Sequence, residues 1–276
     1  MNVRLRKHDP CNGSAVLLRG FDIWRRGSAA LPLLAAMNLL AAGGGVAAAT
    51  NNLSDAEIQG RRLAQQLLEQ QRPAESFTNT GVLKVKDGRS RRSESPVKFQ
   101  TITTTSNWLT VYEITGDQTN FARLTVIHDS NRPNQYDLQK NGMVKTSGEG
   151  FLTGNEAMIP FGGSDFWAVD LGLEFFHWPE QKLLKRVVRS SRGCSVVEST
   201  NPDPATNGYS RVVSWIDSES DGIIHAEAYD AKGKLLKEYD TKKLKKVNGQ
   251  WQVEEIEICN DQTGSRTRLE FDLKKK

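Results

Sequence analysis

Histidine and cysteine are scarce in this chain, and those present lack the spacing that metal binding or nucleophilic catalysis requires. The 276 residues include four histidines and three cysteines. No HExxH or CxxC motif places them as zinc ligands, and no serine lies in a Gly-x-Ser-x-Gly elbow. The one glycine run, at 43–45, belongs to a leader segment and not to a phosphate-binding loop. The sequence therefore predicts no enzyme, no metal site and no cofactor.

Three carboxylates near the middle of the chain are the nearest approach to acid–base chemistry. Asp165, Asp170 and Glu174 are close enough in sequence to be paired. Acidic residues at such spacings are ordinary on the solvent-facing side of an amphipathic segment. We therefore interpret all three as exposed polar positions and not as catalytic groups.

The first 49 residues have the parts of a secretory signal peptide. Arg25 and Arg26 precede an apolar run at 28–42, and small residues follow as far as Ala49. The run is short for a membrane span. We predict cleavage after Ala49 and a mature domain at 50–276 in the periplasm; a retained membrane anchor or a transit peptide is the alternative.

A net positive charge is also lacking once this leader is removed. The whole chain has 37 basic and 33 acidic residues, of which residues 1–49 hold six and two, so 31 of each remain. Nucleic-acid binding requires a net basic surface that displaces counterions from phosphates. Nucleic acid is therefore not an expected partner.

Two cysteines, Cys194 and Cys259, remain in the predicted mature chain. In an oxidising compartment a disulfide between them would close a loop of about 65 residues and stabilise the fold by roughly 3 to 4 kcal/mol. The alternative is two separate buried thiols that behave as small hydrophobic side chains. The sequence leaves both possibilities open.

A helix is predicted at the start of the mature domain, over 54–71. Ser54 and Glu57 have the spacing of a capping box, and Pro73 marks the end. The residues that share its apolar face are Ile58, Ala64, Leu67 and Leu68.

From Phe77 onward the hydrophobic period becomes two, which predicts strands. They lie at 78–86, 97–105, 107–114, 121–128, 135–140, 182–189, 194–199, 209–217, 222–230, 234–244, 251–260 and 265–273. Strands joined by short turns form an antiparallel meander, and a long meander curls to bury its concave side. The predicted fold class is α+β and mostly antiparallel β: a curved, half-open β-barrel covered by the N-terminal helix and an aromatic lid.

That lid is predicted at residues 164–178, SDFWAVDLGLEFFHW, where five large aromatic side chains occur in fifteen residues. So much aromatic area is buried in a core, faces a membrane or lines an apolar pocket. We expect Ser164 to cap a helical turn, Pro179 to end it, and the segment to enclose an apolar cavity with inward-facing strand residues. The alternative is that these aromatics are only core. The predicted cavity lining is Trp108, Tyr112, Phe166, Trp167, Leu171, Phe175, Trp215 and Tyr229.

Several segments resemble the LolA-like outer-membrane lipoprotein-sorting protein family. They are GGSDFWAVDLGLEFFHWPEQKLLK at 162–185, CSVVES at 194–199, GYSRVVSWID at 208–217, AEAYDAKGKLLKEY at 226–239 and KKVNGQWQVEEIEI at 245–258. The resemblance covers most of the mature chain. It implies a half-open antiparallel barrel closed by helices, which carries the acyl chains of lipoproteins across the periplasm without enzyme activity or a cofactor.

The resemblance also implies partners. These are lipoproteins or other acylated cargo, an inner-membrane ABC transporter and an outer-membrane acceptor, with the carrier itself a monomer. Carriers of this family have an arginine on an early strand that bonds the lid. Here Arg89, Arg91 and Arg92 lie in a hydrophilic hairpin, so that role stays unassigned. The same half-barrel would also suit a periplasmic regulator that senses lipid or lipoprotein and signals through a protein partner.

Overall fold

The computed structural model describes residues 53–115, 121–129, 132–141, 143–145, 150–247 and 249–273. The predicted leader at 1–49 and its cleavage site lie outside the described residues. No helix within the described ranges is long and apolar enough to cross a membrane.

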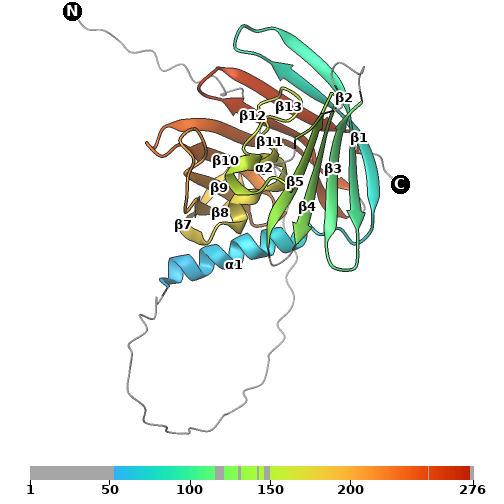
Figure 1. Ribbon diagram of the computed structural model, residues 1–276. Coiled ribbons are helices and arrows are strands. Elements are labelled where there is room, and N and C mark those ends of the chain that lie inside the picture. Colours follow the sequence, from blue (N-terminus) through green and yellow to red (C-terminus); the bar gives the residue numbers. More distant parts are fainter. Residues whose placement is uncertain are drawn as a thin grey trace, which may run out of the picture.

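One antiparallel sheet and a few short helices account for the regular structure (Figure 1). The N-terminal half contains α1 (Asp55–Gln70), β1 (Phe77–Lys86), β2 (Arg92–Thr103), β3 (Trp108–Ile114), β4 (Ala122–Asp129), β5 (Arg132–Lys140) and β6 (Met143–Lys145). The connection that follows contains η1 (Gly154–Ala157), α2 (Ala168–Gly172) and η2 (Glu174–His177). The C-terminal half contains β7 (Glu180–Arg189), β8 (Arg192–Thr200), β9 (Arg211–Asp217), β10 (Ile223–Tyr229), β11 (Leu235–Val247), β12 (Gln250–Asn260) and β13 (Ser265–Phe271).

The thirteen strands have the spatial order β6-β5-β4-β3-β2-β1-β13-β12-β11-β10-β9-β8-β7. The sheet therefore consists of two meanders joined where the first strand pairs with the last, for example Leu83 with Leu269. It is open, because its two edges, β6 and β7, do not pair with each other. The predicted antiparallel, half-open β fold is confirmed, and every predicted strand is present; the short β6 is additional.

The two faces of the sheet differ in chemistry. On β4, Ala122, Leu124 and Val126 point to the concave face and are buried, while the residues between them are only half-buried. This alternation follows from the two-residue period of a strand. The concave face encloses α2, and α1 lies along one end of the curve against β7 (Figure 1). The hydrophobic core is thus inside the curve of the sheet.

Helix α1 begins as the sequence predicts. Ser54 Oγ accepts a hydrogen bond from the Glu57 N–H, and Glu57 Oε2 accepts one from the Ser54 N–H at 2.7 Å. Ala64 and Leu67 are buried, but Ile58 is 53% exposed and was wrongly assigned to the buried face. Gly60 takes the contact position instead: a Cβ there would lie 2.6 Å from the backbone carbonyl carbon of Gln181. Helix and strand approach each other this closely because the glycine has no side chain.

We predict that Gly60→Ala destabilises the protein by about 1 to 3 kcal/mol because the added methyl group overpacks against the backbone of β7. The sign of the change in the free energy of unfolding is informative, because Gly→Ala in an unobstructed helix stabilises a protein by about 1 kcal/mol. Urea unfolding of the wild type and the variant measures this change in stability. Gln66→Ala, at an exposed position of α1, is the control and should leave the free energy of unfolding nearly unchanged. A more stable Gly60→Ala variant would contradict this packing.

Candidate functional site

The connection between β6 and β7 is the candidate functional element, because it covers the concave face. Its first part pairs with β5, where Tyr136 and Leu152 exchange two hydrogen bonds of 2.9 Å. It then forms a narrow turn in which the Phe161 N–H donates to the Phe166 carbonyl oxygen at 2.8 Å. We call residues 160–179 the lid segment; it includes α2 and η2. The segment ends at the opposite edge of the sheet, where β7 begins at Glu180.

Two short helices form within the lid segment, although not where Ser164 was expected to cap one. Helix α2 begins at Ala168, and the Trp167 N–H donates to Asp170 Oδ2 at 2.8 Å at its start. Ser164 Oγ instead accepts a bond from the Phe166 N–H within the preceding turn. Leu173 has a φ of 51°, in the left-handed region, and this residue separates α2 from η2. The predicted Ser164 cap is therefore wrong, while the stop before Pro179 is correct.

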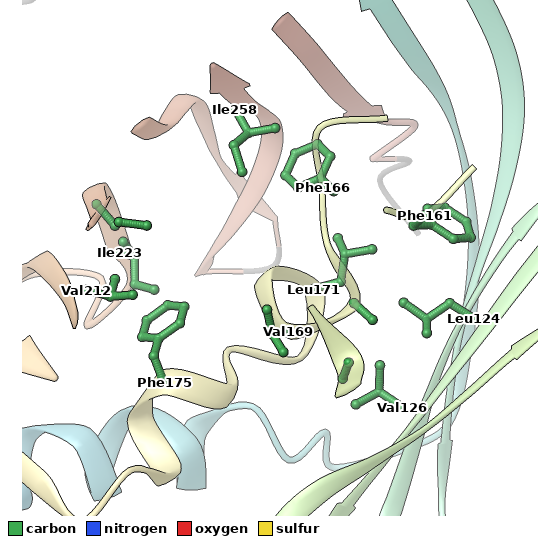
Figure 2. Packing of buried hydrophobic residues seen from close by; sticks show 14 of the residues in the cluster. Leu124, Val126, Phe161, Phe166, Val169, Leu171, Phe175, Val212, Ile223 and Ile258 are labelled. Carbon is green, nitrogen blue, oxygen red and sulfur yellow. The ribbon is translucent and has the colours of Figure 1, made fainter. Parts of the chain in front are cut away.

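Apolar side chains of the lid segment fill the concave space. Leu171 and Phe175 lie between the two halves of the sheet, with Leu124 on one side and Val212 and Ile223 on the other (Figure 2). Phe166 and Phe176 are also buried. Full burial of one such side chain contributes about 1.5 to 3 kcal/mol. The lid is therefore held chiefly by the same apolar burial that forms the core.

A small cavity of about 20 Å³ remains between η2 and the C-terminal half of the sheet. Its apolar lining comes from Leu173 and Phe175 of the lid and from Val212, Ile223, Ala226, Ala228 and Ile258 of the sheet. The alanines matter here, because their small side chains on β10 leave space that larger residues would fill. The lid thus leaves little space between η2 and this part of the sheet.

A polar cluster beneath the lid fixes its position. Lys237 of β11 is 2% exposed, and its Nζ donates to the Asp165 carbonyl oxygen at 2.7 Å and to Asp170 Oδ2 at 3.3 Å. The same ammonium group lies 3.6 Å from the centroid of the Trp167 ring. Burial lowers the pKa of Lys237 to about 8, an effect that the neighbouring Asp170 opposes. The buried Lys237 ammonium group therefore contacts three positions of the lid segment, Asp165, Trp167 and Asp170.

The Asp165 carboxylate is bound to β13, and the Asp170 carboxylate is bound to the connection between β8 and β9. Asp165 Oδ2 accepts from Thr267 Oγ1 at 2.8 Å, and Thr267 Oγ1 accepts from the Asp165 N–H at 2.9 Å. Asp170 Oδ1 accepts from the Tyr209 hydroxyl at 2.9 Å. Asp170 is thus both ion-paired with Lys237 and hydrogen-bonded, while hydrogen bonds from hydroxyl groups compensate the buried Asp165 carboxylate.

Glu174 forms a second buried polar contact, on the opposite half of the sheet. It is 2% exposed, and its Oε2 accepts from the Tyr136 hydroxyl at 3.0 Å and from the Asn134 N–H at 3.2 Å. Burial raises the pKa of Glu174 to about 7, although both hydrogen bonds favour the ionised form. Asn134 also donates to the Gly172 carbonyl oxygen at 2.8 Å. Since Asp165 is only 8% exposed as well, the interpretation of these carboxylates as solvent-facing positions was wrong.

An open cleft of about 310 Å³ lies where α1, η2 and the ends of β3 and β4 meet. Trp108 and His128 stack there with ring centroids 4.9 Å apart, and His177 of η2 also lines the cleft. Burial lowers the pKa of both histidines to about 4. The imidazoles are therefore neutral at pH 7 and add no positive charge to the cleft.

The comparisons with known proteins agree with this geometry. A family model described as an uncharacterized protein matches residues 151–275, and no curated protein matches the chain. A DUF1329 family protein from Desulfovibrio piger has a TM-score of 0.66 and 17% sequence identity, over 79% of this chain and 92% of its own. A domain from Vibrio parahaemolyticus that is named for outer-membrane lipoprotein sorting has a TM-score of 0.65 and 20% identity over the same shares. A LolA superfamily protein from Nitrosomonas europaea has a TM-score of 0.53 and 16% identity, over 80% of this chain and 93% of its own.

The chain has the LolA-like fold. At these identities the likeness concerns the architecture, and it confirms the fold that the sequence resemblance implied. Within this LolA-like fold, the cation that contacts the lid is Lys237, on β11. Arg91, in the turn between β1 and β2, instead pairs with Asp87 through Nε and Oδ2 at 2.6 Å. Sequence analysis missed Lys237, because lysines are frequent in the predicted strand at 234–244 and no local signal marks this one as buried.

Five of the predicted lining residues lie together in the core beneath or within the lid: Tyr112, Phe166, Trp167, Leu171 and Phe175. Trp108 lies in the cleft under α1. Trp215 and Tyr229 do not belong to this set. Val212 and Ile216 face the cavity side, so Trp215 between them points to the convex face, where it contacts His225. Tyr229 likewise bonds Glu227 on the convex face, so the inward assignment of both aromatics was wrong.

The possible disulfide between Cys194 and Cys259 is not formed, because Cys194 is a free, buried thiol. Cys194 is on β8 and Cys259 is on β12, and three strands separate β8 from β12 in the sheet. Four strand spacings amount to about 19 Å. A disulfide requires Cα atoms within about 7 Å. The even number of cysteines in the mature chain was therefore misleading.

We predict that Glu174→Gln makes stability less dependent on pH. In the unfolded chain this carboxyl ionises above about pH 4.5, but in the folded protein it keeps its proton up to about pH 7. As pH rises, the unfolded state therefore releases this proton at a lower pH than the folded state does. Between pH 4.5 and 8 the free energy of unfolding of the wild type decreases by about 3 kcal/mol for this reason, and that of the variant does not. The glutamine carbonyl oxygen preserves an acceptor for Tyr136 and Asn134.

Urea unfolding of both proteins at pH 4.5, 6 and 8 measures this difference. The stability of the variant relative to the wild type should rise with pH. Glu94→Gln, an exposed change on β2, is the control and should give a constant difference. A relative stability of Glu174→Gln that stays flat or falls with pH would contradict the raised pKa.

Proposed function

We propose that the protein is a periplasmic carrier that binds the acyl chains of lipoproteins on the concave face covered by the lid segment and sorts them to the outer membrane. The observation that carries the proposal is a lid that is both apolar and separable from the sheet. It covers the concave face with aromatic and aliphatic side chains, while the strand-like pairing of this connection with β5 lies before it, at Leu152. The similarity in fold to a domain named for outer-membrane lipoprotein sorting supports this reading.

Acyl chains would replace the lid rather than fill an existing space. The closed cavity of about 20 Å³ is too small for a fatty acyl chain. Each methylene moved from water into an apolar site gains about 0.8 kcal/mol, so a sixteen-carbon chain gains roughly 13 kcal/mol. Displacing five large apolar lid side chains costs about 7 to 15 kcal/mol on the same scale. Loading and release are therefore close to balance, which suits a carrier.

The polar contacts give the lid segment a defined closed position. Lys237 binds Asp170 of α2 to the C-terminal half of the sheet, and Glu174 binds the start of η2 to the N-terminal half. Because both groups are buried, lid opening exposes them to water and recovers part of their desolvation cost. A lid held by apolar contacts alone would lack a unique closed position. The proposal therefore assigns binding, and no chemical reaction, to this site.

Binding of a fluorescent triacylated lipopeptide to the protein tests the function. We expect saturable binding at one site, no binding of the same peptide without acyl chains, and transfer of the loaded lipopeptide to acceptor vesicles. Ala226→Phe places a ring on the cavity floor of β10 and should weaken binding at least tenfold. Val188→Phe, at a position that is 77% exposed, is the control and should bind as the wild type does.

Two results would contradict the proposal. If circular dichroism shows that both proteins are folded, equal binding by Ala226→Phe and the wild type would show that the cavity is not part of the binding site. Retention of the lipopeptide without transfer to vesicles would favour a lipid sensor that signals through a protein partner over a carrier.

A further inference from the structure

We propose a divalent metal site on the convex face of the sheet, formed by His225, Glu227 and Glu238 with Asp240 as the orienting partner. These four residues, the His225 cluster, lie on β10 and β11, on the face opposite the lid. The site is independent of the proposed carrier function. It would take a transition-metal ion such as Zn²⁺, which imidazole and carboxylate ligands suit.

The strand register brings the cluster together. His225 pairs with Asp240, and Glu227 pairs with Glu238, as directly opposite residues of an antiparallel ladder. Ala226, between the two β10 members, points to the lid side. Two short motifs, His-x-Glu and Glu-x-Asp, therefore present four ligand-type side chains on one patch. Neither motif has the spacing of a familiar zinc motif, which is why the sequence analysis predicted no metal site.

The distances fit a shared ion. One ligand atom from each of His225, Glu227 and Glu238 lies within 4.8 Å of the other two. His225 Nε2 and Glu227 Oε1 are 3.5 Å apart. Two ligands bound tetrahedrally at 2.0 to 2.1 Å from one zinc ion are about 3.3 Å apart. His225 and Glu227 are thus already at ligand spacing, and a small rotation of Glu238 would complete the set.

Hydrogen bonds orient two of these ligands. His225 Nδ1 is 2.8 Å from Asp240 Oδ1, which directs Nε2 toward the glutamates. A carboxylate on the far nitrogen of a metal-bound histidine is the usual arrangement around zinc. The Tyr229 hydroxyl donates to Glu227 Oε2 and leaves Oε1 directed at His225. Trp215 packs against the His225 ring and fixes its plane.

The charges around the cluster are also compatible with a bound cation, although His225 pairs with Glu227 and Asp240 when it is protonated. Glu227 and Glu238 are directly opposite each other, an arrangement of like charges that destabilises a sheet. Within the described residues no lysine or arginine makes an ion pair with either glutamate. Lys242 pairs instead with Asp240 at 3.2 Å and with Glu257, while Arg189 and Arg211 lie over the rings of Trp215 and Tyr229. A divalent ion between the two glutamates would neutralise this patch.

Calorimetric titration of the full-length protein, purified without a histidine tag, with Zn²⁺ at pH 7.5 tests the proposal. We expect one saturable site with a dissociation constant in the micromolar range or below. His225→Gln and Glu238→Gln should each weaken binding at least thirtyfold. Asp240→Asn should weaken it by about 10 to 100-fold through loss of histidine orientation. Glu254→Gln on β12 is the matched control and should bind as the wild type does.

A second readout separates coordination from unspecific binding. Co²⁺ bound to the wild type should give the visible absorption of a four-coordinate site, and His225→Gln should lose it. If His225→Gln does not fold, the half-buried Glu238→Gln provides the same comparison. Absence of saturable Zn²⁺ binding to the wild type would overturn the proposal and leave the cluster as an ion-pair network. Unchanged binding by folded His225→Gln or Glu238→Gln would overturn it as well.

Discussion

The structure depends on one topological constraint: the two edges of the open sheet, β6 and β7, are consecutive strands of the chain. Their connection must therefore pass from one edge to the other, and in this structure it does so across the concave face. Covering that face is favourable because Leu124, Val126 and Ile223 would otherwise expose their side chains to water. The lid is thus a consequence of strand order, and its aromatic composition follows from the apolar surface that it covers.

The polar contacts beneath the lid have a different role from the apolar ones. A buried lysine or glutamate contributes little net stability, because desolvation offsets its ion pairs and hydrogen bonds. Lys237 and Glu174 instead specify where α2 and η2 lie on the sheet. The apolar contacts favour closure, and the polar contacts select one closed arrangement. Under the proposed carrier function, this division allows a lid that covers so much of the core to separate from it.

The fold was predictable from the sequence because strand alternation and turn residues are local signals. The predicted helix over 54–71 and the structure's Asp55–Gln70 differ by one residue at each end, and strand ends such as that of β8 differ by one or two. The side of the sheet on which each aromatic side chain lies was harder to predict. An irregularity between Ile223 and His225 shifts the register of β10, and aromatic character alone does not distinguish the inward Tyr112 from the outward Trp215 and Tyr229. Lys237 and the His225 cluster depend on cross-strand pairs, which no single segment of sequence reveals.

Hydrogen exchange of the lid segment, measured with and without a bound triacylated lipopeptide, tests the central claim most directly. The account predicts that loading decreases the protection of the amides of residues 164–178 and leaves the central strands β1 and β13 as protected as before. This result would show that acyl chains take the place of the lid on the concave face. Unchanged or increased protection of residues 164–178 in the loaded protein would contradict it, because the lid would then be a permanent part of the core.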